Sequence, residues 1–161
     1  MTKQIKLSVL LIAVISIASC TGIYEDTTEL AESYRPLVKE ISVDELKAKT
    51  DSAAEYLLID VRQPSDYYTA NIPGSVLLQR GLLEFKIADS DFWMSQYMYP
   101  PEKNSEIIVY CGAGNNSVLA AVQLMQLGYK NVKSLKGGYK AYNPNQDPNA
   151  KPKAASGGCG G

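Results

Sequence analysis

The sequence contains no histidine among its 161 residues. This absence excludes cysteine–histidine and serine–histidine nucleophile pairs, histidine-ligated metal sites and acid–base catalysis by imidazole. An excess of positive charge is also missing, because 16 Lys and Arg residues face 17 Asp and Glu residues and the formal net charge is -1. No basic field exists to attract nucleic acid. Any chemistry must therefore proceed without imidazole, and no nucleic-acid partner is expected.

Long apolar runs are scarce as well. The longest, residues 7–17, follows Lys3 and Lys6 and is far shorter than the roughly 20 residues that a membrane-spanning helix needs. Small residues come after it, and residues 17–20, with the sequence Ile-Ala-Ser-Cys, resemble the lipobox of bacterial lipoproteins. In that motif the cysteine receives the lipid.

This resemblance predicts how the N-terminus is processed. We expect residues 1–19 to be a lipoprotein signal peptide and Cys20 to carry the lipid that anchors the protein to a membrane of the cell envelope. A plain signal peptide with a coincidental cysteine is the alternative. Thr21, rather than Asp, follows the cysteine, which slightly favours the outer membrane if the host is Gram-negative.

The rest of the chain is long enough for one compact domain and too short for two ordinary ones. Residues 20–35 are polar and acidic, with too little apolar periodicity for a core helix, and are predicted to be a tether. The globular pattern extends over residues 36–142. Residues 143–161 are rich in Pro, Asn and Gly, contain Cys159, and are expected to form a disordered tail.

Strand patterns alternate with helical patterns throughout residues 36–142, which predicts an α/β fold. Continuous apolar runs are typical of strands buried on both faces of a parallel sheet. Ser42 and Glu45 form a capping-box pattern, and Gly128 is placed for a left-handed helix cap. The predicted strands are residues 37–41, 56–60, 76–78, 107–110 and 132–135. The predicted helices are residues 42–49, a helix beginning at Pro64, 81–87, 91–99, 117–127 and 139–142.

Cys111 directly follows the strand of residues 107–110 and precedes the helix of residues 117–127 by a short loop. Its thiol should therefore lie at the carboxyl edge of a parallel sheet, where α/β folds bind ligands. The loop is rich in small residues, so it can curl until several backbone N–H groups point at one centre. Such a nest, together with the helix dipole, favours the thiolate without a histidine. The expected amide donors are Gly112, Ala113, Gly114, Asn115, Asn116 and Ser117.

Four segments resemble rhodanese-like domains in order and spacing. They are residues 60–62 (Asp-Val-Arg), residues 67–75, the loop of residues 111–116, and residues 135–138 with Tyr142. The resemblance spans residues 36–142 and implies a central, mostly parallel sheet flanked by helices on both faces. It also implies a sulfurtransferase with Cys111 as the catalytic residue. In this family a six-residue loop is associated with sulfur rather than phosphate transfer.

Two positions depart from the family pattern. Asn116 stands where the loop usually ends in arginine, and Asn71 stands where histidine usually precedes Ile-Pro-Gly. The missing arginine removes a fixed positive charge that would hold a dianion such as thiosulfate, and it disfavours a phosphatase or an arsenate reductase. Arg80 replaces that charge if its side chain reaches the loop, and is otherwise a solvated or ion-paired residue. Asp60 and Arg62 are expected to form a structural pair, to anchor the loop or to support a substrate.

The resulting prediction is a membrane-tethered sulfurtransferase that needs no metal or organic cofactor. Cys111 takes sulfane sulfur from thiosulfate, a persulfide or a polysulfide, holds it as a persulfide, and passes it to a thiol or another nucleophilic acceptor. Cys159 is either an incidental thiol or a mobile second thiol that receives this sulfur or forms a disulfide with Cys111. The alternative, favoured by the missing loop arginine, is a catalytically degenerate binding or sensor module at the cell envelope.

Overall fold

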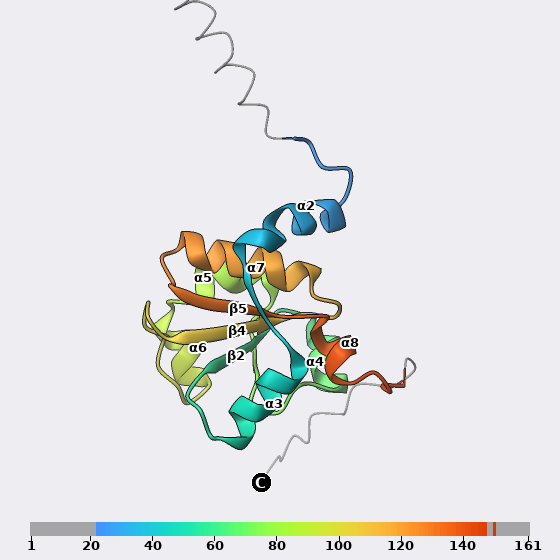
Figure 1. The fold of residues 1–161 in the computed structure, drawn as a ribbon. Helices are drawn as coiled ribbons and strands as arrows, with labels where there is room; N and C mark the ends of the chain where they lie inside the picture. The colour runs from blue at the N-terminus through green and yellow to red at the C-terminus, as the bar shows by residue number, and fades with distance from the viewer. Residues whose placement is uncertain (1–21, 148–149, 151–161) are drawn as a thin grey trace, which may run out of the picture.

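A computed structural model describes residues 22–147 and residue 150 of the chain. Five strands form one sheet in the order β1-β5-β4-β2-β3, and every neighbouring pair is parallel (Figure 1). Helices cover both faces of this sheet, which confirms the predicted α/β architecture. The strands are β1 (Lys39–Ile41), β2 (Leu57–Asp60), β3 (Val76–Leu77), β4 (Glu106–Tyr110) and β5 (Asn131–Leu135).

The helices connect these strands and all are short. Within the described residues, none is long and apolar enough to cross a membrane. The α-helices are α2 (Thr27–Tyr34), α3 (Val43–Asp51), α4 (Pro64–Thr69), α5 (Leu83–Lys86), α6 (Ser90–Ser95), α7 (Asn115–Gln126) and α8 (Gly138–Tyr142). Two 3-10 turns, η1 (Arg35–Leu37) and η2 (Arg80–Leu82), complete the set.

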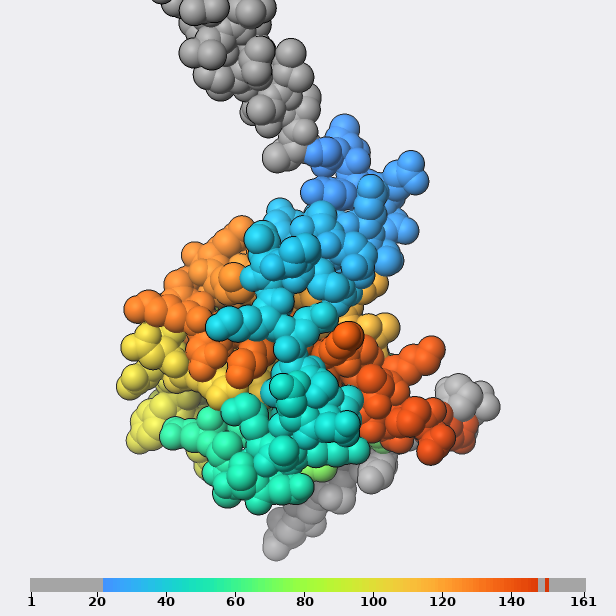
Figure 2. Space-filling model, in the orientation of Figure 1, coloured from blue at the N-terminus to red at the C-terminus, as the bar shows by residue number. Residues whose placement is uncertain are grey.

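The N-terminal segment differs from the predicted tether. Helix α2 begins after Asp26, whose carboxylate accepts hydrogen bonds from the backbone N–H groups of Thr28 and Glu29 at 2.7 and 2.8 Å. Ala31 is completely buried, and α2 packs along α7, where the blue and orange segments meet in Figure 2. The prediction of a tether for residues 20–35 is therefore wrong over α2. Sequence periodicity misses this helix because its apolar face is narrow: Ala31 is its buried residue, and Tyr34 packs against the core only partly buried.

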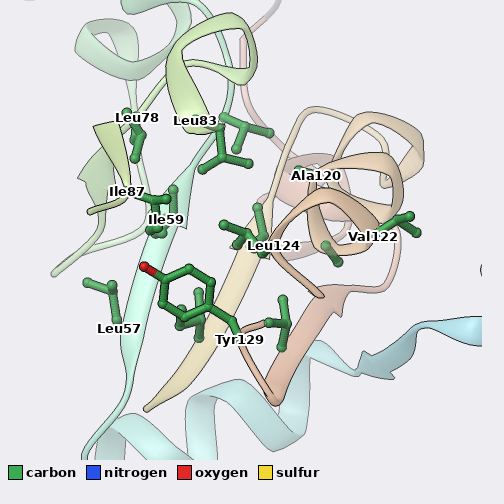
Figure 3. Packing of buried hydrophobic residues seen from close by; sticks show 14 of the residues in the cluster. Leu57, Ile59, Leu78, Leu83, Ile87, Ala120, Val122, Leu124 and Tyr129 are labelled. Atoms are coloured by element: carbon green, nitrogen blue, oxygen red, sulfur yellow. The ribbon is translucent and has the colours of Figure 1, made fainter. Parts of the chain in front are cut away.

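Strand β4 is buried on both faces, as its continuous apolar run predicts. Successive side chains alternate between the faces, so Ile107 and Val109 pack with α5, α6 and α7, whereas Ile108 and Tyr110 pack with α3 and α8. Figure 3 shows the first of these layers, in which Leu124 of α7 lies over the sheet. The two layers hold the carboxyl end of β4, and hence the start of the Cys111 loop, in place.

Two of the local helix signals are confirmed. The Ser42 hydroxyl accepts the backbone N–H of Glu45 at 3.2 Å, while the Glu45 carboxylate accepts that of Ser42 at 2.8 Å, which is the predicted capping box. Gly128 has a φ of +89°, as a left-handed cap requires. The helix predicted to run to residue 99 instead ends at Ser95, because Tyr97 adopts a φ of +57° and lies fully exposed.

Glu106 of β4 forms ion pairs with two lysines, and these are expected to stabilise the fold in a pH-dependent way. Its carboxylate accepts hydrogen bonds from Lys49 at 3.0 Å and from Lys133 at 2.8 Å. Burial alone would raise the pKa of Glu106, but the hydrogen bonds and charges of Lys133 and Lys49 outweigh it and hold the pKa below its usual value. A carboxylate of this kind stabilises the fold above its unfolded pKa, and the contribution is lost as the pH falls through the folded pKa.

We therefore expect Glu106→Gln to lower the free energy of unfolding by about 1 kcal/mol at neutral pH. Between about pH 5 and pH 3 the difference between this variant and the wild type should shrink toward zero. Urea denaturation across that pH range measures both effects, with Glu102→Gln, at an exposed position nearby, as the control. A difference that does not change with pH would contradict the ionic origin of the stabilisation.

Candidate active site

Cys111 directly follows the last residue of β4, at the carboxyl edge of the sheet. Its side chain is buried, with 4% of its surface exposed. The backbone N–H of Gly114 donates a hydrogen bond to its Sγ at 3.1 Å. Of the six predicted amide donors, Gly114 is the one whose N–H is bonded to this sulfur within the described residues. Contacts from the other amides to a charged intermediate stay a prediction.

The loop after Cys111 is tighter than the sequence indicates. Helix α7 begins at Asn115, two residues before the predicted start. The prediction missed these residues because they are polar and carry no apolar periodicity. Gly114 is the N-cap and has a φ of +101°, a left-handed conformation that glycine adopts without strain. This turn directs the Gly114 N–H back toward Sγ. The same residue therefore starts the helix and contacts the thiol.

Two buried hydroxyl groups lie beneath the thiol. Ser117 Oγ is 3.6 Å from Cys111 Sγ and donates to the carbonyl of Gly114 at 3.0 Å. Ser134 of β5 donates to Ser117 Oγ at 2.9 Å, and both serines are fully buried. Sequence reasoning named Ser117 for its backbone amide and missed Ser134. The available signal was a polar residue two positions after Val132, on the apolar face of a predicted strand.

Helix α8 holds the loop from its other side. The backbone N–H of Tyr139 donates to the Cys111 carbonyl at 2.7 Å, and that of Lys140 donates to the Gly112 carbonyl at 2.9 Å. This approach is possible because Gly138 has no side chain: a Cβ there would lie 2.4 Å from the Cys111 carbonyl oxygen. The glycine at position 138, the first residue of α8, is thus required by the close contact with the Cys111 loop.

Asp60 and Arg62 form a buried structural pair. Arg62 donates to the Asp60 carboxylate through Nε at 3.0 Å and through Nη2 at 2.7 Å, and Nη2 also reaches the Ala70 carbonyl at 2.8 Å. The guanidinium carbon lies 4.2 Å from the centre of the Tyr139 ring. Burial alone would lower the pKa of Arg62, but the hydrogen bonds and charge of Asp60 raise it. The pair therefore ties β2, the segment after α4 and α8 together.

Tyr110 anchors the turn that follows α4. Its hydroxyl accepts the backbone N–H of Ile72 at 3.1 Å and lies 2.9 Å from the Ser75 hydroxyl. Burial raises the pKa of Tyr110 well above its usual range, so the hydroxyl stays neutral. Asn71, which stands in place of the usual histidine, donates to the Tyr67 carbonyl at 3.1 Å. At this position the structure shows an amide that closes the end of α4.

Comparison with family models matches most of the parallel sheet and the Cys111 loop to one family. The family model described as the rhodanese-like domain matches residues 42–145, more than half of the chain. The chain belongs to the rhodanese-like family. The matched residues include β2, β4, the Cys111 loop and α8, whereas α2 and Arg35 lie outside them.

Relatives of this rhodanese-like domain include sulfurtransferases. A sulfurtransferase of Allochromatium vinosum is 27% identical over 106 residues, which cover 66% of this chain and 89% of that protein. An adenylyltransferase and sulfurtransferase of Lodderomyces elongisporus is 31% identical over 133 residues. That match covers 81% of this chain but 28% of the other protein, so the chain corresponds to one part of it.

Solved structures show the same fold. A human single-domain sulfurtransferase has a TM-score of 0.61 at 21% identity, covering 68% of this chain and 99% of that chain. A Rhodopseudomonas palustris protein of unknown function, described as a possible tyrosine phosphatase, has a TM-score of 0.63 at 24% identity. The match covers 77% of this chain and 93% of that chain. At these identities the likeness establishes the rhodanese fold and nothing finer.

Arg80 does not reach the loop of the rhodanese-like domain. Its Nη1 donates to the Glu84 carboxylate at 2.6 Å, one helical turn further along the chain. Among the described residues, Glu84 is the ion-pair partner of Arg80, and no hydrogen bond or ion pair joins the Arg80 side chain to residues 111–117. The structure therefore gives no support to the prediction that Arg80 supplies the missing charge.

A cavity of about 480 Å³ adjoins the loop. Its lining includes Arg62, Gly112, Ala113 and Tyr139. A supporting role of Arg62 toward a substrate stays a prediction. Residues from the end of the domain also line it, including Lys140, Asn143, Gln146 and Ala150. The remaining two candidate residues, Cys20 and Cys159, lie outside the described residues.

Proposed function

We propose that this rhodanese-like domain is a sulfurtransferase that carries sulfane sulfur as a persulfide on Cys111. The observation that supports this most directly is the contact between the Gly114 N–H and Cys111 Sγ at 3.1 Å. A backbone N–H aimed at sulfur stabilises a thiolate and, in the next step, the negative charge of a persulfide. The sulfurtransferases among the chain's relatives agree with this activity at the level of the family.

The proposed reaction has two steps. The Cys111 thiolate attacks the outer sulfur of a donor, forming a new S–S bond while the donor's own bond to that sulfur breaks and the leaving group departs with the electron pair. Sulfite leaves when the donor is thiosulfate, and a shortened polysulfide leaves when it is a polysulfide. A nucleophilic acceptor then attacks the terminal sulfur, which releases the Cys111 thiolate unchanged. No external oxidant or reductant is needed.

The donor that we favour rests on the missing arginine of the loop, because the lysine in the adjoining cavity, Lys140, is a flexible cation without the arginine fork. Asn116 provides no positive charge, and Arg80 pairs with Glu84 rather than with the loop. The oxygen atoms of thiosulfate can accept the fork of hydrogen bonds from a fixed arginine, whereas the sulfur atoms of a persulfide or polysulfide are weak acceptors and gain less from it. We therefore favour a persulfide or polysulfide as the donor over thiosulfate, while the acceptor is a thiol or another nucleophile.

Mass spectrometry of the sulfur-loaded protein tests this function. After incubation with polysulfide, the peptide that contains Cys111 should gain the mass of one sulfur atom, and cyanide or a thiol should remove it. Thiosulfate should load the same peptide more slowly. Sulfur found on the Cys159 peptide only after Cys111 is loaded would identify Cys159 as the second thiol. If no donor loads Cys111, the domain is not a sulfurtransferase.

The second candidate function is a binding or sensor module without turnover. It is favoured by one observation, the asparagine at position 116 where an arginine usually closes the loop. Against it stands a buried thiol with a backbone N–H directed at its sulfur. A module of this kind would bind an anion or a protein near the loop but would form no persulfide with any of the donors above.

We also propose that the protein is tethered to a membrane of the cell envelope through a lipid on Cys20. The support is the lipobox-like sequence of residues 17–20 after the apolar stretch. In cells fed a labelled fatty acid, the wild type should take up label and Cys20→Ala should take up none. An unlabelled wild type recovered from the soluble fraction would rule out the lipid anchor.

A further inference from the structure

Arg35 links the N-terminal helix to the active-site loop. It lies in the turn between α2 and β1, seven residues before the part of the chain that the family model matches. Its Nη2 donates a hydrogen bond to Asn115 Oδ1 at 3.0 Å, although the two residues are 80 positions apart. Asn115 in turn donates from Nδ2 to the hydroxyl of Thr28 at 3.5 Å. The first side chain of α7 is thus held from both ends of α2.

The positive charge of Arg35 is neutralised by two neighbouring carboxylates. Glu32 accepts hydrogen bonds from its Nε at 3.0 Å and its Nη2 at 2.8 Å, and Glu40 forms a second ion pair through Nη1. The hydrogen bond with Glu32 is the main reason that the pKa of Arg35 is raised. Two carboxylates face one guanidinium, so no net positive charge is left for an anion in the loop. The contact with Asn115 therefore acts through position rather than through attraction.

The position matters because Asn115 adjoins the residue that contacts the thiol. Gly114, with its φ of +101°, immediately precedes Asn115 and directs its N–H at Cys111 Sγ. Any rotation of the first turn of α7 moves this N–H. Helix α8 restrains the Cys111 end of the loop through the Tyr139 N–H, but the Asn115 end is restrained by α2 and Arg35.

The packing of α2 makes this restraint effective. Ala31 is completely buried where α2 packs against α7, and the Arg35 side chain is three-quarters buried. In Figure 2 the light-blue end of this segment lies against the orange part of the domain. The carboxylates of Glu32 and Glu40 fix the Arg35 guanidinium, so little side-chain freedom is left for the bond with Asn115 to restrict. It can therefore hold Asn115 in one orientation.

We propose that Arg35 is a positioning residue for the Cys111 site. Through Asn115 it sets the first turn of α7, and with it the direction of the Gly114 N–H that contacts the sulfur. The N-terminal helix then belongs to the working site although it lies outside the matched family region. The effect of Arg35 on sulfur transfer rests on the proposed function, whereas its effect on the reactivity of the thiol does not.

Alkylation of Cys111 by iodoacetamide, a neutral reagent that needs no sulfur donor, tests this in the full chain. We expect Arg35→Gln to slow alkylation of the Cys111 peptide about fivefold, as the loss of one hydrogen bond predicts. Asn115→Ala should slow it equally, and the double variant should be no slower than either single one. Arg35→Lys should not restore the rate, because an ammonium group cannot reproduce the fork of hydrogen bonds.

Glu29→Gln is the matched control, since it removes an exposed charge of the same helix whose side-chain bond is to the Glu25 N–H and not to Arg35 or Asn115. Its alkylation rate should stay at that of the wild type. Thermal unfolding identifies variants that do not fold. If Arg35→Gln is one of them, the alkylation rate of Asn115→Ala tests the proposal. Wild-type rates in a folded Asn115→Ala, or additive effects in the double variant, would overturn the proposal. If the wild type alkylates but accepts no sulfur, the sulfurtransferase function fails and the positioning role stands.

Discussion

Replacing Cys111 with alanine should reduce sulfur transfer from every sulfane donor by more than about 1,000-fold, the scale expected when a catalytic nucleophile is removed. The chain has no histidine to activate a water or a hydroxyl in its place. The neighbouring hydroxyls of Ser117 and Ser134 are buried and hydrogen-bonded, so they are not alternative nucleophiles. Turnover with polysulfide as donor and cyanide or a small thiol as acceptor measures the loss.

Cys111→Ser separates the chemistry from the packing. The serine hydroxyl is close in size to the thiol and can accept the Gly114 N–H, but it does not ionise at neutral pH, so we expect the same loss of turnover with an unchanged melting temperature. Activity within about tenfold of the wild type in either variant would mean that the sulfur travels on another thiol. Cys20 and Cys159 are the other two cysteines of the chain.

Gly138→Ala should be the most destabilising single change near the site. Gly138 has a φ of +59°, and a Cβ would lie 2.4 Å from the Cys111 carbonyl oxygen and 2.9 Å from the Gly112 carbonyl. The left-handed backbone costs an L-residue about 1–2 kcal/mol, and forcing an atom into a packed region costs about 1–3 kcal/mol more. We expect the free energy of unfolding to fall by about 2–5 kcal/mol, measured by urea denaturation.

The same variant should also lose sulfur transfer while it is still folded. Backbone atoms cannot rotate away as a flexible side chain does, so the Cys111 carbonyl must move and its 2.7 Å hydrogen bond with the Tyr139 N–H must break. Gly128→Ala is the control, because Gly128 has a φ of +89° with open space around its Cβ position. It should lose stability through backbone conformation alone and keep its activity. Equal effects of the two substitutions would contradict the steric explanation.

Most of the sheet could be predicted from sequence. The runs at residues 56–60 and 107–110 correspond to β2 and β4, because strands buried on both faces are uniformly apolar. The capping box at Ser42 and the left-handed glycine after α7 could be predicted equally well, since each depends only on residues close in the sequence. Helix α2 could not be predicted from an apolar pattern, because Ala31 is the one residue of this helix that is buried.

The site was predictable in part. The strand before it and the small residues after it place Cys111 at the carboxyl edge of the sheet. The partner of Arg80 was open on sequence alone, because the sequence does not show how far the loop lies from residue 80. The structure places Arg80 with Glu84 and brings Arg35, from a segment predicted to be a tether, to the loop instead.

By itself the sequence determined the α/β class, the residue that carries the thiol and the exclusion of imidazole chemistry. These follow from periodicity and from the residue types present, which are local properties of the chain. Only the tertiary structure decided what supports the thiol and its loop: Ser134 comes from β5, Gly138 from α8 and Arg35 from the N-terminal segment. Such contacts join residues far apart in the chain, so they depend on how the elements pack and leave no periodic pattern to read.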